Sequence, residues 1–498
     1  MQSSQRLLIF IVAYNAERHI EKVLDRIPKT ALLQYDYEIL IIDDQSKDHT
    51  FENALRYQEL HPDLHITVLY NPVNQGYGGN QKLGYHYAQL HGFDIVLLLH
   101  GDGQYAPEEF ERLIHPILQD EADAVFGSRM MNKRDALKGK MPYYKFVGNI
   151  LLTRMQNLIL GTHLSEFHSG YRAYRVQSLA HLPIERNSND FHFDTQIIIQ
   201  LVLAKMKIVE VPIPTHYGDE ICYVNGTQYA YNIIVASIHS RLQSLGIFYK
   251  REYDLQHRPD YKLKDTYPST HSYLINKIQA GSKILMIGGS DGLVSERLRK
   301  KNCTVYGYDI LPSQFPSRFD QFISIQDLDS ISLHASEFDI IILDGILENI
   351  KEPEKLMDHL RDSIGLSNPE IYIVVANIGF FITRFSLLFG GFNYGRRGIL
   401  DLNHTRLFTK KSIIKLCHQS GFEVQSTEGI PAPYPEAIGD SVLAHWMVAL
   451  NNFSLKLFKG LFSYQYVLSA KAKPSVKNLI RYTLDGSEKK KKELIHLN

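Results

Sequence analysis

A short polar turn follows a run of apolar residues in the N-terminal half of the chain. Residues 95–99 are apolar, and His100, Gly101, Asp102, Gly103 and Gln104 come directly after them. Such a bounded run is typical of a central strand, and open α/β sheets bind ligands at the carboxyl ends of their strands. Asp102 and the Gln104 carbonyl could hold a hard cation there, beside glycines that admit a bulky diphosphate. An ordinary turn before a helix explains this stretch equally well.

The elements around this turn alternate between strand and helix patterns. Apolar runs at residues 7–13, 37–42 and 65–70 each end in a polar cluster, and helical spacing follows each cluster. Alternation of this kind predicts a parallel, doubly wound sheet. Because the carboxyl ends of parallel strands meet at one edge, we expect the polar clusters to line one crevice.

Composition limits the class of protein. The chain has 498 residues, of which 44% are hydrophobic and 22% are charged, so it is long enough for two or three globular domains. Basic and acidic residues number 54 each, which argues against nucleic-acid binding. Three widely spaced cysteines favour a reducing compartment. Without a long apolar run for a signal peptide or a membrane span, we expect a cytoplasmic protein.

Five stretches of the N-terminal half follow one another in a familiar order: IIDDQSKDHT, NQGYGGNQKLGYHYA, HGDGQYAPE, FGSRM and FHSGYRAYR. In this order they resemble the family-2 glycosyltransferases of the GT-A fold, and most closely the subgroup that includes dolichyl-phosphate mannosyl- and glucosyltransferases. The resemblance covers roughly the first 220 residues. It implies a nucleotide-diphosphate sugar as donor, and Mg²⁺ or Mn²⁺ as cofactor.

The resemblance also implies roles for individual residues. Asp44 would read the base and Arg129 would contact phosphate, by the fork geometry that suits phosphate oxygens. Asp102 and Gln104 would bind the metal, and His100 stands where the family has its first metal-site aspartate. The implied nucleotide-sugar set is Ala13, Tyr14, Glu17, Asp43, Asp44, Gly78, Asp102, Gln104 and Arg129.

The acceptor side rests on three residues near the end of the resemblance. Arg172 and Arg175 could bind an acceptor phosphate, although one of them could simply pair with a surface carboxylate. Asp194 stands where many inverting relatives place a general base, and a helix cap is an equal alternative. With Asp102 and Arg129, Asp194 completes the predicted catalytic set for sugar transfer. The acceptor could be a polyprenyl phosphate or a glycan.

A second α/β pattern begins after a polar segment at residues 249–272. A predicted strand at 283–287 leads into a turn that contains Gly288, Ser290 and Gly292, and a second strand ends at Asp309. A glycine-rich β-α turn with an acid at the end of the next strand can hold an adenosyl ligand by its ribose.

Two later stretches, EFDIIILDGILENIKEPEKLMDHL and HTRLFTKKSIIKLCHQSGFEV, extend this pattern. Together, roughly residues 272–424 resemble class I S-adenosylmethionine-dependent methyltransferases. The resemblance places Gly288, Ser290 and Gly292 around the methionine moiety of S-adenosyl-L-methionine, Asp309 on the ribose and Asp344 near the methyl donor. His404 could be a general base for methylation, and a surface histidine is the alternative.

The sequence therefore predicts an α/β protein with two doubly wound Rossmann-like domains. The expected division is a glycosyltransferase domain at 1–248, a linker at 249–272, a methyltransferase-like domain at 273–425 and a helical C-terminal extension at 426–498. The extension carries an apolar helix among lysines, which could pack on the second domain or rest on anionic lipid at the inner face of the membrane.

The predicted function is bifunctional: sugar transfer to a polyprenyl phosphate or glycan, and methylation by the second domain. Two alternatives stay open. The second domain could be a degenerate scaffold that binds a partner, or the chain could be a non-catalytic sensor of nucleotide sugars.

Overall fold

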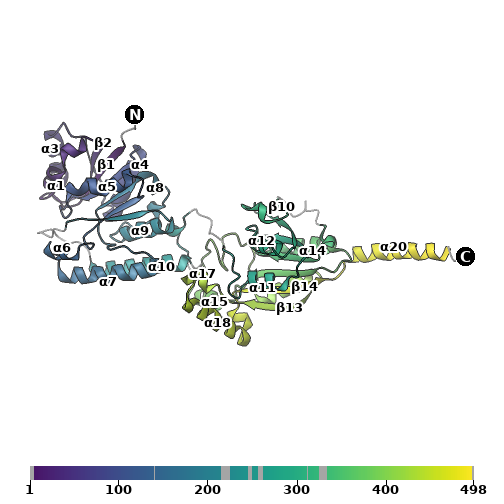
Figure 1. Ribbon diagram of the computed structural model, residues 1–498. Helices are drawn as coiled ribbons and strands as arrows, with labels where there is room; N and C mark the ends of the chain where they lie inside the picture. Colours follow the sequence, from purple (N-terminus) through teal and green to yellow (C-terminus); the bar gives the residue numbers. More distant parts are fainter. Residues whose placement is uncertain are drawn as a thin grey trace. The chain divides into compact units, whose positions relative to one another are not determined.

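The computed structural model describes residues 5–139, 141–214, 225–244, 249–255, 262–310, 312–324 and 334–495. The chain divides into two compact units. The N-terminal unit comprises Met1–Gln243 and Tyr249–His257, and the C-terminal unit comprises Ser244–Phe248 and Arg258–Asn498. Each unit contains a seven-stranded sheet with helices around it (Figure 1).

The sheet of the N-terminal unit has the strand order β3-β2-β1-β4-β6-β5-β7. Its strands are β1 (Arg6–Ala13), β2 (Asp36–Asp43), β3 (Ile66–Tyr70), β4 (Ile95–His100), β5 (Ala124–Ser128), β6 (Arg172–Arg175) and β7 (Ile208–Pro212). Only β6 runs antiparallel to its neighbours among these strands. The sheet is therefore mixed, whereas the sequence predicted a parallel one, because β6 enters between β4 and β5 from the opposite direction.

Period-two alternation in β1 sends side chains to both faces of this sheet. Leu7, Ile9 and Ile11 pack with α1, α3 and α5, while Leu8 and Phe10 pack with α4, α8 and α9. The helices of this unit are α1 (Ile20–Arg26), α2 (Lys29–Leu32), α3 (Thr50–Leu60), α4 (Gly76–Leu90), α5 (Phe110–Leu118), α6 (Lys133–Lys138), α7 (Tyr143–Leu160), α8 (Val176–Ala180), α9 (Phe193–Leu203) and α10 (Gly226–Ser244). Short 3₁₀ turns lie at Pro107–Glu109, Ile184–Arg186 and Arg251–Tyr253.

The sheet of the C-terminal unit has the order β10-β9-β8-β11-β12-β14-β13. Its strands are β8 (Lys283–Gly288), β9 (Thr304–Asp309), β10 (Gln321–Ser324), β11 (Ile340–Asp344), β12 (Glu370–Ala376), β13 (Phe422–Ile430) and β14 (Gln465–Ala472). The strands β8 to β12 pair in parallel, whereas β14 runs antiparallel to β12 and to β13. The parallel part confirms the predicted doubly wound pattern.

Helices cover both faces of the second sheet as well. One core cluster joins β8 and β11 to α14 and α16, and the other joins the opposite side chains of β8 to α11 and α12. The helices are α11 (Thr270–Lys277), α12 (Leu293–Arg299), α13 (Ile346–Asn349), α14 (Pro353–Ile364), α15 (Phe381–Leu388), α16 (Lys410–Gln419), α17 (Tyr434–Ile438), α18 (Val442–Leu457), α19 (Lys459–Phe462) and α20 (Val476–Ile495). Short 3₁₀ turns lie at Pro316–Arg318 and Ala335–Glu337.

The C-terminal extension is not entirely helical. Helices α17 to α20 give it the predicted character, but β13 continues to Ile430 and β14 inserts beside β12. The sequence did not indicate β14, because this strand of eight residues follows a long apolar helix pattern and pairs with strands distant in sequence. Within the described residues, no helix combines the length and the apolarity needed to cross a membrane.

Candidate functional site

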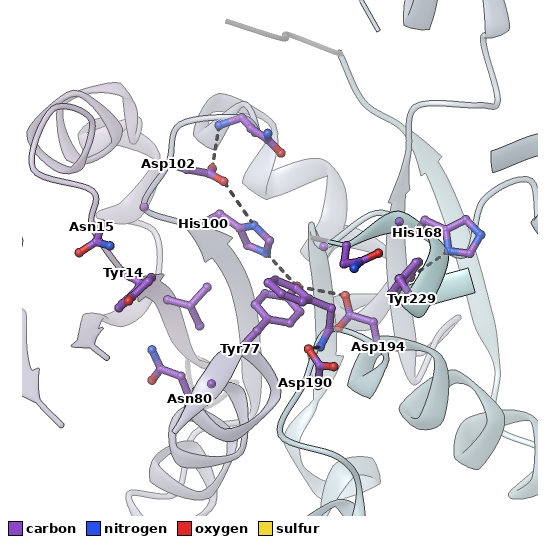
Figure 2. Close-up of a pocket in the computed structure, with 18 of the residues that line it drawn as sticks. Tyr14, Asn15, Tyr77, Asn80, His100, Asp102, His168, Asp190, Asp194 and Tyr229 are labelled. Carbon is purple, nitrogen blue, oxygen red and sulfur yellow. Dashed lines mark hydrogen bonds and ion pairs between the residues drawn. The ribbon is translucent and has the colours of Figure 1, made fainter. Parts of the chain in front are cut away.

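A large pocket opens in the N-terminal unit, where β1, β2 and β4 end. Its volume is about 2030 Å³, and its walls come from the loops after these strands and from α4, α7, α9 and α10 (Figure 2). Pockets for one small ligand usually measure about 300–1,000 Å³. The cavity therefore has room for two substrates side by side.

The end of the pocket beside β1 and β2 contains most of the residues predicted to bind the nucleotide. Ala13, Tyr14, Glu17 and Asp44 all line it. Asp44 is 3% exposed, and its carboxylate accepts hydrogen bonds from the side chain of Asn71 and the backbone N–H of Gln75, both at 2.8 Å. Two donors from the next loop thus hold the Asp44 carboxylate in one orientation.

Asp43 has a different environment from its neighbour. It does not line the pocket; its Oδ1 accepts the backbone N–H of Ser46 at 2.9 Å, and burial raises the pKa of the carboxyl group. Gly78 is also outside the lining: a Cβ atom there would lie 2.6 Å from the Cβ of Phe193 and from the carbonyl oxygen of Ser188. Gly78 therefore permits α4 to approach α9.

The turn after β4 brings His100, Asp102 and Gln104 to the pocket wall. Oδ1 of Asp102 accepts the backbone N–H of Gln104 at 3.0 Å, and Oδ2 lies 4.0 Å from Nδ1 of His100. The side chain of Asp102 is 40% exposed, whereas that of His100 is 15% exposed. Burial lowers the pKa of His100, although Asp102 and Asp194 oppose this effect.

The turn after β4 offers few ligands for the divalent cation that the resemblance implies. Among the residues that the structure describes, no group of three His, Cys, Asp or Glu side chains could hold a metal ion. Mg²⁺, however, is commonly held by one or two carboxylates together with substrate phosphates. Asp102, with His100 beside it, fits a site that the donor's diphosphate completes.

A hydrogen-bond network behind this turn connects His100 to Asp194. The hydroxyl of Tyr77 lies 3.1 Å from Nε2 of His100 and donates to Oδ2 of Asp194 at 3.0 Å (Figure 2). The other carboxylate oxygen of Asp194 accepts a hydrogen bond from Gln81 at 3.1 Å and lies 3.7 Å from the guanidinium of Arg172. Asp194 lines the pocket but is only 6% exposed.

Neither acceptor arginine reaches the pocket lining. The guanidinium of Arg172 is buried, and besides Asp194 it donates to the carbonyl oxygens of Ser169 and Phe167. Arg175 forms an ion pair with Asp120 at 2.6 Å, and the side chain of Asp120 is 83% exposed. The strand register explains its position, because Arg175 lies opposite Ile95 at the start of β4, whereas the pocket lies at the end of that strand.

Arg129 does line the pocket, and a buried carboxylate fixes its guanidinium. Its Nε donates to Oε1 of Glu166 at 3.0 Å, and its backbone N–H donates to Oε2 at 2.7 Å. Burial by itself raises the pKa of Glu166, but Arg129 and Asn149 outweigh it and hold the pKa below its ordinary value. Glu166 was missed in the sequence, although it directly precedes the FHSGYRAYR stretch.

The far end of the pocket combines apolar and unsatisfied polar groups. Met141, Tyr144, Leu151 and Leu152 contribute apolar surface from α7 and the residues before it. Nδ1 of His168 lies 3.0 Å from the hydroxyl of Tyr229, whereas its buried Nε2 has no hydrogen-bond partner in the described part of the chain. Burial lowers the pKa of His168 to about 4, so this ring is neutral. An orphaned buried nitrogen in a pocket wall indicates a ligand group.

The C-terminal unit brings together the residues predicted to bind S-adenosylmethionine. The backbone N–H of Ser290 donates to Asp309 at 3.2 Å, and Gly292 ends the turn with φ +66°. A Cβ atom on Gly288 would lie 2.2 Å from the carbonyl oxygen of Asp344, so β8 and β11 meet there more closely than any other residue would allow. The glycine turn and both carboxylates therefore lie at one edge of the second sheet.

The carboxyl groups near this turn are buried and have few neighbouring positive charges or hydrogen-bond donors. Loss of hydration raises the pKa of Asp344 to about 7, and the charges of Asp291 and Asp309 contribute. Burial raises the pKa of Glu348 to about 8, although the backbone N–H of Ala376 donates to its carboxylate. The sequence analysis missed Glu348, whose only signal was an acid four residues after Asp344 at a helix start.

His404 lies in the loop that precedes Thr405 and Arg406. Its Nδ1 is 3.0 Å from the carbonyl oxygen of Ile399, and burial lowers its pKa. The backbone of Glu348 accepts hydrogen bonds from the two residues after His404, Thr405 and Arg406. The structure therefore anchors the His404 loop to α13.

Two family models match the chain. The model described as "Glycosyl transferase family 2" matches residues 8–182, and the model described as "Methyltransferase domain" matches residues 256–427. These matches confirm both resemblances.

Known relatives match the N-terminal half. A UDP-N-acetylglucosamine–dolichyl-phosphate N-acetylglucosaminyltransferase of Methanococcus voltae is 29% identical over 224 residues, which are 43% of this chain and 86% of that protein. An undecaprenyl-phosphate mannosyltransferase of Micrococcus luteus is 28% identical over 212 residues, 42% of this chain and 82% of that protein.

Among solved structures, glucosyl-3-phosphoglycerate synthase from Mycobacterium tuberculosis, in complex with Mn²⁺, uridine diphosphate and glucosyl-3-phosphoglycerate, is 16% identical with a TM-score of 0.36. That likeness covers 47% of this chain and 80% of that one. From the family matches and the two sheets, the chain carries a family-2 glycosyltransferase domain followed by a methyltransferase domain.

Proposed function

We propose that the N-terminal unit transfers a sugar from a nucleotide-diphosphate sugar to a polyprenyl phosphate. The observation that carries this proposal is one cavity lined by Asp44 and Asp102, by Arg129, and by apolar side chains of α7. The relatives named for dolichyl-phosphate and undecaprenyl-phosphate transfer support the lipid acceptor.

In the proposed reaction, an oxygen of the acceptor phosphate attacks the anomeric carbon of the sugar. The bond from that carbon to the diphosphate breaks, and the electron pair leaves with the nucleoside diphosphate. Arg129, held by Glu166, stabilises charge on the departing phosphates. A Mg²⁺ or Mn²⁺ ion held by Asp102 and His100 would neutralise further charge on the diphosphate. The backbone N–H of Gln104 orients the Asp102 carboxylate.

The acceptor phosphate is already ionised near neutral pH, so it needs little help from a general base. This suits the position of Asp194, whose carboxylate is engaged by Tyr77, Gln81 and Arg172. Asp194 therefore acts as a positioning residue in this proposal. A glycan hydroxyl as acceptor would instead require Asp194 to give up these partners and accept a proton.

The acceptor would occupy the end of the pocket beside α7. Apolar side chains there suit an isoprenoid chain, and the orphaned Nε2 of His168 suits a hydrogen bond to the acceptor phosphate or the sugar. Arg172 and Arg175 have no part in this arrangement, because their guanidinium groups are bound elsewhere.

The test supplies radiolabelled nucleotide sugars and a polyprenyl phosphate in detergent to the full chain. We expect label to enter the organic phase, and we expect Asp194→Asn to retain measurable transfer. Label that enters only water-soluble glycan, together with an inactive Asp194→Asn variant, would reject the lipid acceptor and establish Asp194 as the base.

We also propose that the C-terminal unit binds S-adenosyl-L-methionine and transfers its methyl group, with His404 as the proton acceptor. The sulfonium of this cofactor is cationic, and the buried carboxyl group of Asp344 fits it, because a cation beside this group would favour its ionised form. Isothermal titration calorimetry on the full chain tests this assignment. If S-adenosyl-L-methionine did not bind at millimolar concentration, the assignment would be wrong, and the unit would instead be a scaffold that binds a partner.

A lipid acceptor requires contact with a bilayer, and α18 supplies a surface for it. Ala444, Val448, Asn451 and Leu455 form the buried side of this helix. Its other side exposes large apolar residues, whose exposed fractions are 61% for Trp446, 50% for Leu450, 60% for Phe453 and 65% for Leu457. Helices with aromatic and leucine residues on one face can bind in the interfacial region of a membrane. We propose that this face makes peripheral contact with lipid at the cytoplasmic side.

Trp446 is the only tryptophan of the chain, so its fluorescence reports on this face alone. Anionic vesicles should shift its emission to the blue, and Leu450→Ser with Phe453→Ser should reduce the shift. The control is Leu366→Ser, which removes a residue that is 48% exposed elsewhere on the same unit. A blue shift that depends on protein concentration and not on vesicles would identify a second copy as the occupant instead.

A further inference from the structure

The pocket contains a continuous series of polar groups that ends at the proposed metal site. Arg172 lies 3.7 Å from Asp194, Tyr77 donates to Asp194 at 3.0 Å, and the Tyr77 oxygen lies 3.1 Å from Nε2 of His100. Nδ1 of His100 then faces Oδ2 of Asp102 at 4.0 Å. Figure 2 shows the part of this series that runs from Asp194 through Tyr77 and His100 to Asp102.

The contacts of Asp194 determine where the hydrogens of Tyr77 and His100 lie. Asp194 beside Arg172 is a carboxylate and has no proton to give, so the single hydroxyl hydrogen of Tyr77 points to Asp194. The Tyr77 oxygen must then accept a hydrogen from His100, which places that hydrogen on Nε2. A neutral imidazole with hydrogen on Nε2 has its lone pair on Nδ1.

This arrangement leaves Nδ1 of His100 without a hydrogen. Nδ1 of His100 and Oδ2 of Asp102 are both acceptors, and they face each other at 4.0 Å without a hydrogen between them. The second oxygen of Asp102 already accepts the backbone N–H of Gln104. Two facing acceptors require a cation or a water molecule between them, and metal-bound histidines commonly donate their other ring N–H to an orienting group in this manner.

Packing keeps the imidazole in this orientation. A Cβ atom on Gly170 would lie 2.4 Å from Nε2 of His100 and 2.9 Å from the Tyr77 oxygen, so only glycine leaves space for the hydrogen bond between them. The backbone N–H of Gly170 is in turn fixed by the hydroxyl of Tyr105 at 2.7 Å. Tyr105 also packs edge-on against the His100 ring, with ring centroids 5.0 Å apart.

We infer that Tyr77 and Asp194 are positioning residues that present Nδ1 of His100 as a nitrogen ligand, so the donor site prefers a transition-metal ion such as Mn²⁺ over Mg²⁺. Imidazole nitrogen suits first-row transition ions, among which Mn²⁺ binds most weakly, whereas Mg²⁺ takes oxygen ligands in near-ideal octahedral geometry. This inference rests on the proposed function, because the donor's diphosphate completes the coordination. It gives Asp194 a role that does not involve proton transfer in the reaction.

The test uses the full chain with Mn²⁺ and uridine diphosphate, and electron spin-echo spectroscopy of the bound Mn²⁺. We expect modulation from a directly bound nitrogen, and its loss in His100→Asp. Tyr77→Phe removes only the hydroxyl and should weaken Mn²⁺ binding by roughly 10–100-fold, the usual effect of losing an outer partner of a metal ligand. Tyr57→Phe is the matched control, because it removes a hydroxyl that also donates to a carboxylate, that of Asp25 at 2.9 Å, but lies outside the pocket lining, and it should keep the nitrogen signal.

Calorimetry gives the second readout. His100→Asp replaces nitrogen by oxygen, so the ratio of Mn²⁺ to Mg²⁺ affinity should fall towards that of an all-oxygen site. Bound Mn²⁺ without nitrogen modulation in the unmodified chain would overturn the inference, and so would an unchanged metal ratio in His100→Asp. Sugar transfer measured on the same samples separates this failure from failure of the proposed function, since transfer could persist without a nitrogen ligand.

Discussion

The two units place carboxylates at equivalent edges of their sheets but compensate them differently. In the N-terminal unit, Glu166 is paired with Arg129 and Asp194 with Arg172. In the C-terminal unit, Asp344 and Glu348 form no ion pair within the described residues, and their pKa values rise to about 7 and about 8. The paired acids of the N-terminal unit are therefore held as carboxylates, whereas the two acids of the C-terminal unit are largely protonated near neutral pH, and a cation bound beside them would favour their ionisation.

The comparison teaches that glycine turns at strand ends do not decide the ligand. Both sheets have the same kind of edge. The two edges differ in which of their acids lie beside an arginine, and substitutions can test this difference.

Removal of the Asp102 carboxylate should have the largest effect on activity. In Asp102→Ala we expect sugar transfer to fall by about a thousandfold, which corresponds to roughly 4 kcal/mol of transition-state stabilisation. Glu108→Ala is the control, because its carboxylate belongs to the same loop but pairs with Arg26 at 2.8 Å. Normal turnover by a folded Asp102→Ala protein would refute the metal assignment.

Removing one partner of the buried ion pair between Glu166 and Arg129 should destabilise the N-terminal unit. Glu166→Ala leaves the guanidinium of Arg129, whose side chain is 10% exposed, without its carboxylate. We expect the free energy of unfolding to fall by about 3–5 kcal/mol, as for other buried pairs that lose one partner. Asp120→Ala breaks the exposed pair with Arg175 and should cost less than about 1 kcal/mol in the same urea titration. Equal losses in the two variants would contradict the account.

An uncompensated carboxyl group should make stability depend on pH in the opposite sense to a paired one. The folded-state pKa of Glu348 is raised to about 8, so between its ordinary value of 4.5 and 8 the folded chain holds a proton that the unfolded chain releases. Stability from this group is present at low pH and is lost as pH rises to about 8, by on the order of a few kcal/mol. Glu348→Gln should flatten this slope in chemical denaturation, whereas Glu354→Gln, at an exposed pair with Arg406, should not.

The smallest expected effect concerns the ribose contact in the second unit. Asp309→Ala should weaken binding of S-adenosylmethionine by about 1.5–3 kcal/mol for each charged hydrogen bond that is lost. Asp309→Asn keeps an oxygen for the backbone N–H of Ser290 and should weaken binding less. If the two variants bound equally, the charge of Asp309 would have no role.

Much of the fold could be predicted from the sequence, because apolar strands and polar turns are local patterns. The turn from His100 to Gln104 and the glycine turn after β8 are both at their expected strand ends. What could not be predicted depends on pairing between distant segments: the antiparallel entry of β6, the insertion of β14, and the burial of Arg172 against Asp194. The role of Tyr77 arises only when α4, β4 and α9 meet, and that of Glu166 arises only when its loop reaches Arg129 after β5 and Asn149 on α7.

The most direct test of the two-site account is calorimetry of the full chain with two ligands and two variants. Uridine diphosphate with Mn²⁺ and S-adenosylmethionine should each bind the unmodified chain. We predict that Asp102→Ala loses only the first ligand with its metal, and that Asp309→Ala weakens only the second. If either variant changed both ligands equally, or if S-adenosylmethionine bound no more tightly than its uncharged product S-adenosylhomocysteine, the contrast between an anion site and a cation site would be contradicted.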